Sequence, residues 1–286
     1  MHRTTLSFWH VVYGMQRIRK APDKAPDKAP ETRSAPRPAA TLILLRDAPG
    51  GLETLMIERH AGLGFAPGAL VFPGGCLAAE DRGSSGSSGG GLHPARLAAI
   101  RETFEECGIL LARRRHDGAL PDPARCADLA ARYRARLLSG DITFGALLEA
   151  EGLVPAADRL VPFGHWVTPS VRPRRFDTVF FIAAASPGQQ AQPDGSEIVS
   201  CRWGRPAEIL GEADAGAARL IFATRMNLMR LAASRTVAEA VEAAMRQPLV
   251  RIVPEWIETP GGAELRIPHG AGYGPCVVPA VPADLG

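Results

Sequence analysis

The sequence predicts an α/β or α+β sandwich, in which a mixed β-sheet is flanked by helices. Two observations carry this prediction. Short runs rich in β-branched and aromatic residues, bounded by glycine and proline, recur along the chain and are typical of strands. Longer segments with apolar residues every three or four positions lie between them and indicate helices. At 286 residues the chain can bury a sizeable core, as one large domain or as one domain with insertions.

The first 37 residues differ in composition from the rest of the chain. Residues 21–31 repeat Ala-Pro-Asp-Lys and continue with Ala-Pro-Glu, which is typical of a stiff, solvated linker. Residues 1–20 lack the roughly 20-residue apolar run of a membrane span, and their charge order is the reverse of a signal peptide's. We therefore expect residues 1–37 to form a disordered tail and Pro-rich linker, with an amphipathic anchor as the alternative. Residues 38–286 are expected to form the folded domain.

The folded part is expected to open with two strands, at residues 40–46 and 52–59, around a turn rich in glycine and proline. A short strand at residues 69–72 runs into the Gly74-Gly75 loop. Residues 82–93 then form an inserted loop whose Gly/Ser composition is typical of a flexible segment. Such an insert can protrude without disturbing the loop before it or the helix after it.

Residues 101–109 are the most informative segment, because they place three carboxylates on one face of a predicted helix. Glu102, Glu105 and Glu106 share that face, since residues three and four positions apart are neighbours on a helix. Apolar residues recur on the opposite side, which can pack into a core. Carboxylates this close repel one another, and hard oxygen ligands suit Mg²⁺ or Mn²⁺. The segment therefore indicates a metal-binding face, with a solvated acidic helix face as the plain alternative.

The remaining elements follow the same two patterns. Residues 122–152 are expected to form extra helices with a break at residues 139–141. Three further strands are expected at residues 159–168, 178–183 and 198–203. A further helix is expected to start at Pro206, and residues 219–246 are expected to be strongly helical. A closing hairpin is expected from residues 249–257 and 264–267.

Composition excludes several classes of protein. The chain is 46% hydrophobic and 22% charged, which is ordinary for a globular protein. A net charge of +3 is too small to indicate nucleic-acid binding. The five cysteines are odd in number and contain no Cys-x-x-Cys pair, so neither a zinc site nor a disulfide framework is expected. A reducing cytoplasm fits these cysteines best.

The carboxylate segment resembles the second half of the Nudix box, where an Arg-Glu pair is followed by a Glu-Glu pair, a glycine and a bulky apolar residue. The residues in register are Arg101, Glu102, Glu105, Glu106, Gly108 and Ile109. Thr103 stands at an apolar position of the box, and the first glutamate of the box falls on Glu80 or Asp81, depending on which glycine of the Gly74-Gly75 loop starts the count. The resemblance implies a Nudix fold in which Arg101 pairs with a box carboxylate and braces the loop.

Other segments resemble the coenzyme A and acyl-coenzyme A diphosphatase branch of this superfamily, which includes peroxisomal enzymes and bacterial relatives. They are residues 71–75, 100–112, 166–169 and 174–181, within a resemblance that covers about residues 38–255. Arg59 and Gly68 match the branch signature upstream of the box, but His60 and Gly64 depart from it. Gly64 stands where the signature has a second arginine. Arginines 172, 174 and 175 could supply the lost phosphate contact, because a guanidinium matches phosphate oxygens bidentately.

The resemblance implies hydrolysis of a diphosphate linkage with Mg²⁺ or Mn²⁺ as cofactor. Glu105 and Glu106 are the expected main metal ligands, Glu102 is the third ligand or a base, and Glu197 is the expected general base. The Gly74 and Gly75 backbone allows close approach to metal or phosphate. The cations expected to bind the substrate are Arg59, Arg174 and Arg175.

Three functions stay open. The first is hydrolysis of coenzyme A or acyl-coenzyme A to 3′,5′-ADP and (acyl-)phosphopantetheine. The second is a Nudix pyrophosphatase acting on ADP-ribose, NADH or another nucleotide, which the arginine missing at Gly64 favours. The third is a non-catalytic binding protein on a Nudix scaffold, against which the intact glutamates argue. The expected partner is a small nucleotide diphosphate, neither nucleic acid nor a membrane, and a homodimer is one arrangement that stays open.

Overall fold

The computed structural model of the protein describes residues 35–83, 93–274 and 276–280. The chain divides into two compact units, Met1–Arg33 and Ser34–Gly286, and the described residues all belong to the second. Of the tail and linker expected at residues 1–37, residues 1–34 lie outside the described residues. The same holds for residues 84–92 of the insert expected at residues 82–93.

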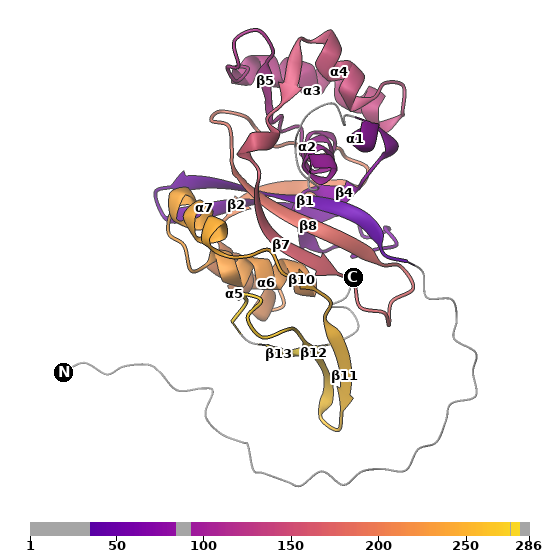
Figure 1. Ribbon diagram of the computed structural model, residues 1–286, viewed down its shortest axis with the longest axis vertical. Coiled ribbons are helices and arrows are strands. Elements are labelled where there is room, and N and C mark those ends of the chain that lie inside the picture. The colour runs from indigo at the N-terminus through magenta and orange to yellow at the C-terminus, as the bar shows by residue number, and fades with distance from the viewer. Residues whose placement is uncertain (1–34, 84–92, 275, 281–286) are drawn as a thin grey trace, which may run out of the picture. The chain divides into compact units, whose positions relative to one another are not determined.

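A mixed sheet, to which eight strands of the described residues contribute, forms the centre of the domain (Figure 1). The strands are β1 (Arg37–Ala48), β2 (Gly51–Arg59), β3 (Leu70–Val71), β4 (Gly74–Cys76), β7 (Val161–Val167), β8 (Phe176–Ala184), β9 (Ile198–Gly204) and β10 (Arg251–Ile252). The main path runs β10-β7-β8-β1-β2-β3, while β4 pairs with β1 and β9 with β2. Because β1 runs parallel to β8 and antiparallel to β2 and β4, the sheet is mixed, as the sequence predicts.

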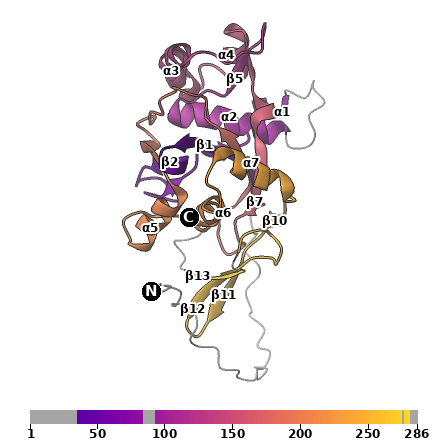
Figure 2. The same cartoon turned by 90° about the vertical axis from the view of Figure 1, so that its left-hand side faces the viewer.

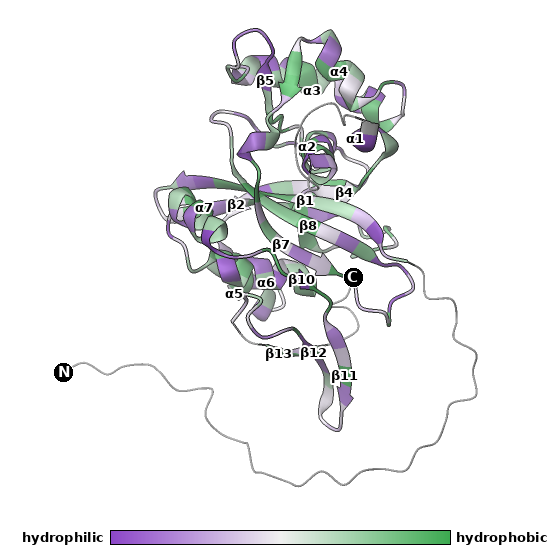
Figure 3. Cartoon of the chain, viewed as in Figure 1, coloured by the Kyte–Doolittle hydropathy of each residue, from purple (hydrophilic) through white to green (hydrophobic). Residues whose placement is uncertain are grey.

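Successive side chains of the central strands point to opposite faces of the sheet, and each face has its own core. On β1, Leu42 and Leu44 belong to one core, whereas Ile43 and Leu45 belong to the other. Strands buried on both faces read as continuous apolar runs, which is why residues 40–46 contain so few polar residues. Figure 3 shows the resulting hydrophobic stretches along β7 and β8.

Helices cover both faces of the sheet (Figures 1 and 2). One side carries α1 (Ala79–Gly83), α2 (His93–Cys107), α3 (Pro123–Leu138) and α4 (Phe144–Ala150), beside a small sheet of β5 (Ala112–Arg114) and β6 (Leu153–Pro155) and a 3₁₀ turn, Ala157–Arg159. The other side carries α5 (Pro206–Asp214), α6 (Phe222–Leu231) and α7 (Val237–Arg246). The predicted sandwich of a mixed sheet flanked by helices is therefore confirmed. Among the described residues, no helix is both long and apolar enough to cross a membrane.

The extra helices expected at residues 122–152 are α3 and α4. Asp122 starts α3 by accepting a hydrogen bond from the Arg125 N–H, and Thr143 starts α4 by accepting one from the Ala146 N–H. The expected break between them is also present, since α3 ends at Leu138.

Residues 219–246 are helical, as expected, but they form two helices, α6 and α7, with a break between them. The Thr236 hydroxyl accepts a hydrogen bond from the Glu239 N–H at 3.2 Å. The Glu239 carboxylate in turn accepts one from the Arg235 N–H at 2.7 Å. This reciprocal arrangement starts a new helix at Val237, although the apolar spacing continues through the break.

The closing hairpin is confirmed at β11 (Glu255–Thr259) and β12 (Gly262–Arg266), but its surroundings differ from the prediction. Residues 249–257 do not form one strand: β10 pairs in parallel with β7, and Pro254 then separates it from β11. A third strand, β13 (Val277–Ala280), pairs with β12. Its short length and Pro279 hide it in the sequence.

Candidate active site

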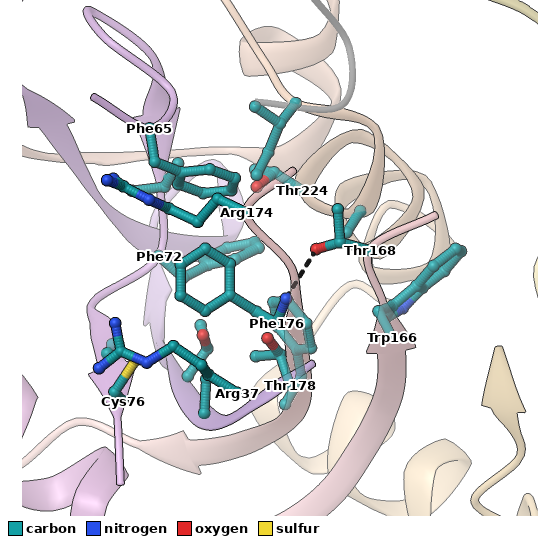
Figure 4. Close-up of a pocket in the computed structure, with 18 of the residues that line it drawn as sticks. Arg37, Phe65, Phe72, Cys76, Trp166, Thr168, Arg174, Phe176, Thr178 and Thr224 are labelled. Atoms are coloured by element: carbon teal, nitrogen blue, oxygen red, sulfur yellow. Dashed lines mark hydrogen bonds between the residues drawn. The ribbon is translucent and has the colours of Figure 1, made fainter. Parts of the chain in front are cut away.

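A cavity of about 500 Å³ opens beside the amino-terminal half of β1 (Figure 4). Alternate residues of two neighbouring parallel strands line it, because they share one face of the sheet. They are Arg37, Ala39 and Thr41 on β1, and Phe176, Thr178 and Phe180 on β8. The wall also contains residues from the Arg59–Cys76 segment, the end of β7 and the segment after it, the turn before β9, the acidic helix α2 and the start of α6. The cavity therefore joins elements that lie far apart in the sequence.

Arg101 ties the acidic helix to the elements before it. Its buried guanidinium donates to Asp81 at 3.2 and 3.0 Å and to the Cys76 carbonyl oxygen at 3.0 Å. It also donates to Glu102 at 3.0 Å and to Glu105 at 3.1 Å. Burial opposes the charge on Arg101, but the hydrogen bond that it donates to Asp81 and the charges of these two glutamates outweigh burial and raise the pKa of Arg101.

The structure decides between the two candidates for the first carboxylate of the box. Asp81 is buried and pairs with Arg101, and its Oδ2 also accepts a hydrogen bond from the Ala78 N–H at 2.7 Å. Glu80 turns away and accepts a hydrogen bond from the Gly145 N–H at 3.2 Å. Asp81 is therefore the carboxylate that connects to the acidic helix, across the insert that separates the two in the sequence.

Of the three glutamates, Glu102 and Glu106 line the cavity, whereas Glu105 is turned to Arg101 and is not among the lining residues. Glu106 is 6% exposed, and its Oε2 accepts a hydrogen bond from the Gly74 N–H at 2.8 Å. Its Oε1 lies 3.9 Å from the Arg59 guanidinium. The two carboxylates thus face the cavity from consecutive turns of α2.

Burial raises the pKa of both carboxylates. For Glu102 it raises the pKa to about 7; the Arg101 charge opposes the shift and the Glu105 charge adds to it. Burial, and next the charge of Glu102, raises the pKa of Glu106 well above its usual range, while the Gly74 N–H and Arg59 offset part of the effect. When Glu102 and Glu106 are both ionised, their negative charge therefore exceeds what the nearby cations neutralise. A bound cation would offset that excess.

The carboxylate oxygens that face the cavity suit a hard divalent cation. Among residues 35–83, 93–274 and 276–280, no three His, Cys, Asp or Glu side chains converge as a ready metal site. Glu102 and Glu106, which line the cavity, would contribute carboxylate oxygens to a bound cation. Glu105 lies beside them on α2. Mg²⁺ commonly binds through one or two carboxylates and completes its shell with water and substrate phosphates, so two lining carboxylates suffice.

The sequence predicts a loop at Gly74-Gly75, but the structure places both residues at the start of β4, which pairs antiparallel with β1. A Cβ on Gly75 would lie 2.4 Å from the Glu102 carboxyl carbon, and a Cβ on Gly74 would lie 2.4 Å from the Ala40 carbonyl oxygen. At Gly74 a Cβ would meet backbone, so only glycine fits there. At Gly75 a Cβ would instead force the Glu102 carboxylate to move.

Glu197 lies in the turn before β9 and lines the cavity. Its backbone is held at both ends: the carbonyl accepts a hydrogen bond from the His60 N–H at 2.7 Å, and the N–H donates to Asp194 at 2.8 Å. The charge of Glu197 contributes to the raised pKa of Glu106. The structure thus brings Glu197 to the acidic face from a distant part of the sequence.

The expected cations separate into two groups. Arg59 and Arg174 line the cavity, whereas Arg175 is not among the lining residues, and its Nε donates to the Thr168 carbonyl at 3.0 Å. Arg37 also lines the cavity. The sequence did not single it out, because the strand predicted at residues 40–46 starts three residues later than β1 does.

The sequence also missed the apolar part of the wall. The aromatic residues that line the cavity are Phe65, Phe72, Trp166, Phe176, Phe180 and Phe222. Trp166 is held from behind, because its Nε1–H donates to the Tyr273 hydroxyl at 3.2 Å, which donates to Asn227 at 2.8 Å. A substrate in this cavity therefore meets carboxylates on one part of the wall and aromatic rings on another.

The fold and the acidic face define a class of protein. A family model described as the NUDT19 Nudix domain matches residues 92–220, which include α2 and β9. The crystal structure of a NUDIX hydrolase from Alicyclobacillus acidocaldarius superimposes with a TM-score of 0.59 and 28% sequence identity, over 73% of this chain and 96% of that one. The chain is therefore similar to Nudix hydrolases in both sequence and fold.

Among these proteins, the sequence is similar to acyl-coenzyme A diphosphatases named NUDT19. It is 30% identical over 204 residues to the Homo sapiens protein, which covers 55% of this chain and 54% of that protein. It is 29% identical over 235 residues to the Gallus gallus protein, which covers 61% of this chain and 62% of that protein. The chain thus spans little more than half the length of these relatives.

Proposed function

We propose that the protein hydrolyses a diphosphate linkage in a nucleoside diphosphate derivative, with coenzyme A or an acyl-coenzyme A as the substrate and Mg²⁺ or Mn²⁺ as the cofactor. The observation that carries the proposal is the pair of carboxylates, the buried Glu106 and the partly buried Glu102, that face one cavity beside the buried Arg101. Glu105, on the same helix, completes the acidic set. The names of the NUDT19 relatives support the choice of substrate.

The chain's own residues divide the work between binding and proton transfer. A bound divalent cation supplies charge neutralisation for the diphosphate oxygens and lowers the pKa of a coordinated water. Glu102 and Glu106 would bind that cation, and Arg101 fixes the position of helix α2, which carries both glutamates. Arg59, whose guanidinium lies 3.9 Å from Glu106, is positioned to contact the diphosphate. Glu197 takes the proton of the water that attacks phosphorus.

The reaction adds one water across the P–O–P bridge. The oxygen of water forms a bond to one phosphorus while the bond from that phosphorus to the bridging oxygen breaks. The bridging oxygen leaves with the bonding electron pair as part of the second phosphate, and the proton lost by water passes to Glu197, so that two monophosphates form. Coenzyme A then gives 3′,5′-ADP and phosphopantetheine, and an acyl-coenzyme A gives the acylated phosphopantetheine. The aromatic part of the cavity wall is suited to the apolar portion of such a substrate.

A substrate panel tests the proposal. Coenzyme A, an acyl-coenzyme A, ADP-ribose and NADH are incubated with Mg²⁺ or Mn²⁺, and the products are identified by mass spectrometry. Release of 3′,5′-ADP from the coenzyme A compounds in preference to other products is expected. Release of AMP from ADP-ribose or NADH instead would favour the second candidate, a Nudix pyrophosphatase for other nucleotides, for which Gly64 in place of an arginine is the specific argument. Binding without turnover of any diphosphate would favour a non-catalytic protein.

We also propose a reducing compartment, the cytoplasm, as the place where the protein works. All five cysteines are free thiols. Burial raises the pKa of the Cys107 and Cys201 thiols, which keeps them protonated and unreactive at neutral pH.

A further inference from the structure

Arg174 forms a second cationic site in the cavity, apart from the acidic helix. It comes from the segment between β7 and β8, and its guanidinium lies against the backbone of Gly64. A Cβ on Gly64 would lie 3.2 Å from Nη1 and 3.7 Å from Nη2 of Arg174, so a side chain at position 64 would crowd the guanidinium. Gly64 is also the position at which the branch signature has an arginine. A guanidinium therefore reaches this part of the wall from another segment of the chain.

Two of the other cations near the cavity already have partners, and a third, Arg37, lies beside Cys76 at the acidic face. Arg101 is paired with Asp81 and two glutamates, and Arg59 donates to the Phe65 carbonyl at 3.2 Å and faces Glu106. Within the part of the chain that the structure describes, the Arg174 guanidinium has no carboxylate or carbonyl partner. A lining guanidinium in this state is free to bind an anion with its planar fork of donors.

The position of Arg174 separates it from the diphosphate. Figure 4 shows Arg174 beside Phe65, whereas Arg37 lies beside Cys76, with Phe72 between the two groups. Cys76 borders the acidic face, since its carbonyl accepts a hydrogen bond from Arg101. Arg59 lies 3.9 Å from Glu106, whereas no ion pair joins Arg174 to a carboxylate among the described residues. A diphosphate held near Glu102 and Glu106 therefore meets Arg59 and Arg37, which leaves Arg174 for another anionic group of the same substrate.

We propose that Arg174 binds a phosphomonoester of the substrate, distinct from the diphosphate that is cleaved, and so selects nucleotides that carry a third phosphate. A phosphomonoester has nearly two negative charges and three acceptor oxygens, which suit a bidentate guanidinium. Coenzyme A carries such a group on its ribose, whereas dephospho-coenzyme A and ADP-ribose do not. Arg174 is thus a specificity-determining residue, and this inference rests on the proposed diphosphatase function.

The test compares coenzyme A with dephospho-coenzyme A, which differ only in that phosphate. The wild-type protein is expected to prefer coenzyme A by about tenfold or more in kcat/KM, the range of one charge-assisted contact. Arg174→Ala and the size-matched Arg174→Gln are expected to raise KM for coenzyme A by about tenfold, with kcat and both constants for dephospho-coenzyme A unchanged. Arg246→Ala is the charge control, because it removes an exposed cation on α7 and should leave both substrates unaffected.

A second pair of variants tests the role of Gly64. Gly64→Ala is expected to displace Arg174 and to reduce the preference for coenzyme A. Gly62→Ala is the matched control: its Cβ would lie 3.1 Å from the His60 ring, a similarly close contact that does not involve Arg174.

Each outcome decides the question. Equal kcat/KM for the two substrates in the wild type, or an equal loss for both in the Arg174 variants, would overturn the inference while the proposed diphosphatase stands. Cleavage of neither substrate would overturn the proposed function and this inference with it.

Discussion

Replacement of Glu102 by Gln is expected to stabilise the metal-free protein at alkaline pH. The folded protein raises the pKa of Glu102 from 4.5 to about 7, chiefly by burial. A gap of about 2.5 pH units corresponds to about 3 kcal/mol of unfolding free energy. Because the folded-state pKa is the raised one, this contribution is fully present below pH 4.5 and is lost as the pH rises through about 7. Gln cannot ionise, and its amide oxygen can still accept the Arg101 hydrogen bond, so the variant keeps the contribution.

Urea and thermal unfolding in EDTA at pH 4.5 and pH 8 measure the effect. Wild type and Glu102→Gln should be about equally stable at pH 4.5. At pH 8 the variant should be more stable by about 2 to 3 kcal/mol, which is roughly 5–10 °C in Tm for a chain of this size. Addition of Mg²⁺ should stabilise the wild type more than the variant, because only the wild type has the full acidic face. Glu242→Gln, at a side chain that is 65% exposed, is the control and should show neither change. The reasoning is refuted if Glu102→Gln has the same pH dependence as the wild type.

Three other substitutions probe the site and its supports. Glu106→Gln keeps an acceptor for the Gly74 N–H, so kcat should fall by about 100-fold or more while Tm shifts by only a few degrees; an insoluble variant would point to a structural role instead. Gly75→Ala should lower both kcat and Tm, because its Cβ would lie 2.4 Å from the Glu102 carboxyl carbon, whereas Gly145→Ala, whose Cβ meets nothing within 4 Å on helix α4, should leave kcat unchanged and should not lower Tm. Tyr273→Phe leaves the Trp166 N–H and the Asn227 side chain without their shared partner, which should cost about 1–3 kcal/mol in urea unfolding; an unchanged midpoint would contradict this.

The sequence was sufficient for the parts of the fold that local patterns determine. The apolar runs of β1 and β2 and the spacing of α2 follow from burial on one or two faces, and the structure has these elements close to the predicted bounds. Even the departure at Thr103 is resolved locally, since its hydroxyl donates to the Ala99 carbonyl at 2.7 Å and so fits an apolar position. Gly108 follows the end of α2 and has a φ of +73°, a left-handed conformation that favours glycine. The presence of a glycine in the box does not by itself indicate that conformation.

The sequence could not show which distant segments contact one another in the fold. Asp81 and Glu80 are neighbours in the chain, and only the fold shows that Arg101 takes Asp81. The aromatic wall likewise depends on β7, β8 and α6 packing beside β1. The contact between Gly64 and Arg174 joins segments more than 100 residues apart, so no spacing rule could predict it.

The most direct test of the acidic face on α2 is the rate of 3′,5′-ADP release from coenzyme A as a function of Mn²⁺ concentration, measured for the wild type and for Glu106→Gln. The wild type should show no release in EDTA and a rate that saturates with Mn²⁺, and Glu106→Gln should remain at least about 100-fold slower at every concentration. Release that is undiminished in EDTA, or equal in the variant and the wild type, would contradict a metal-dependent diphosphatase built on these glutamates.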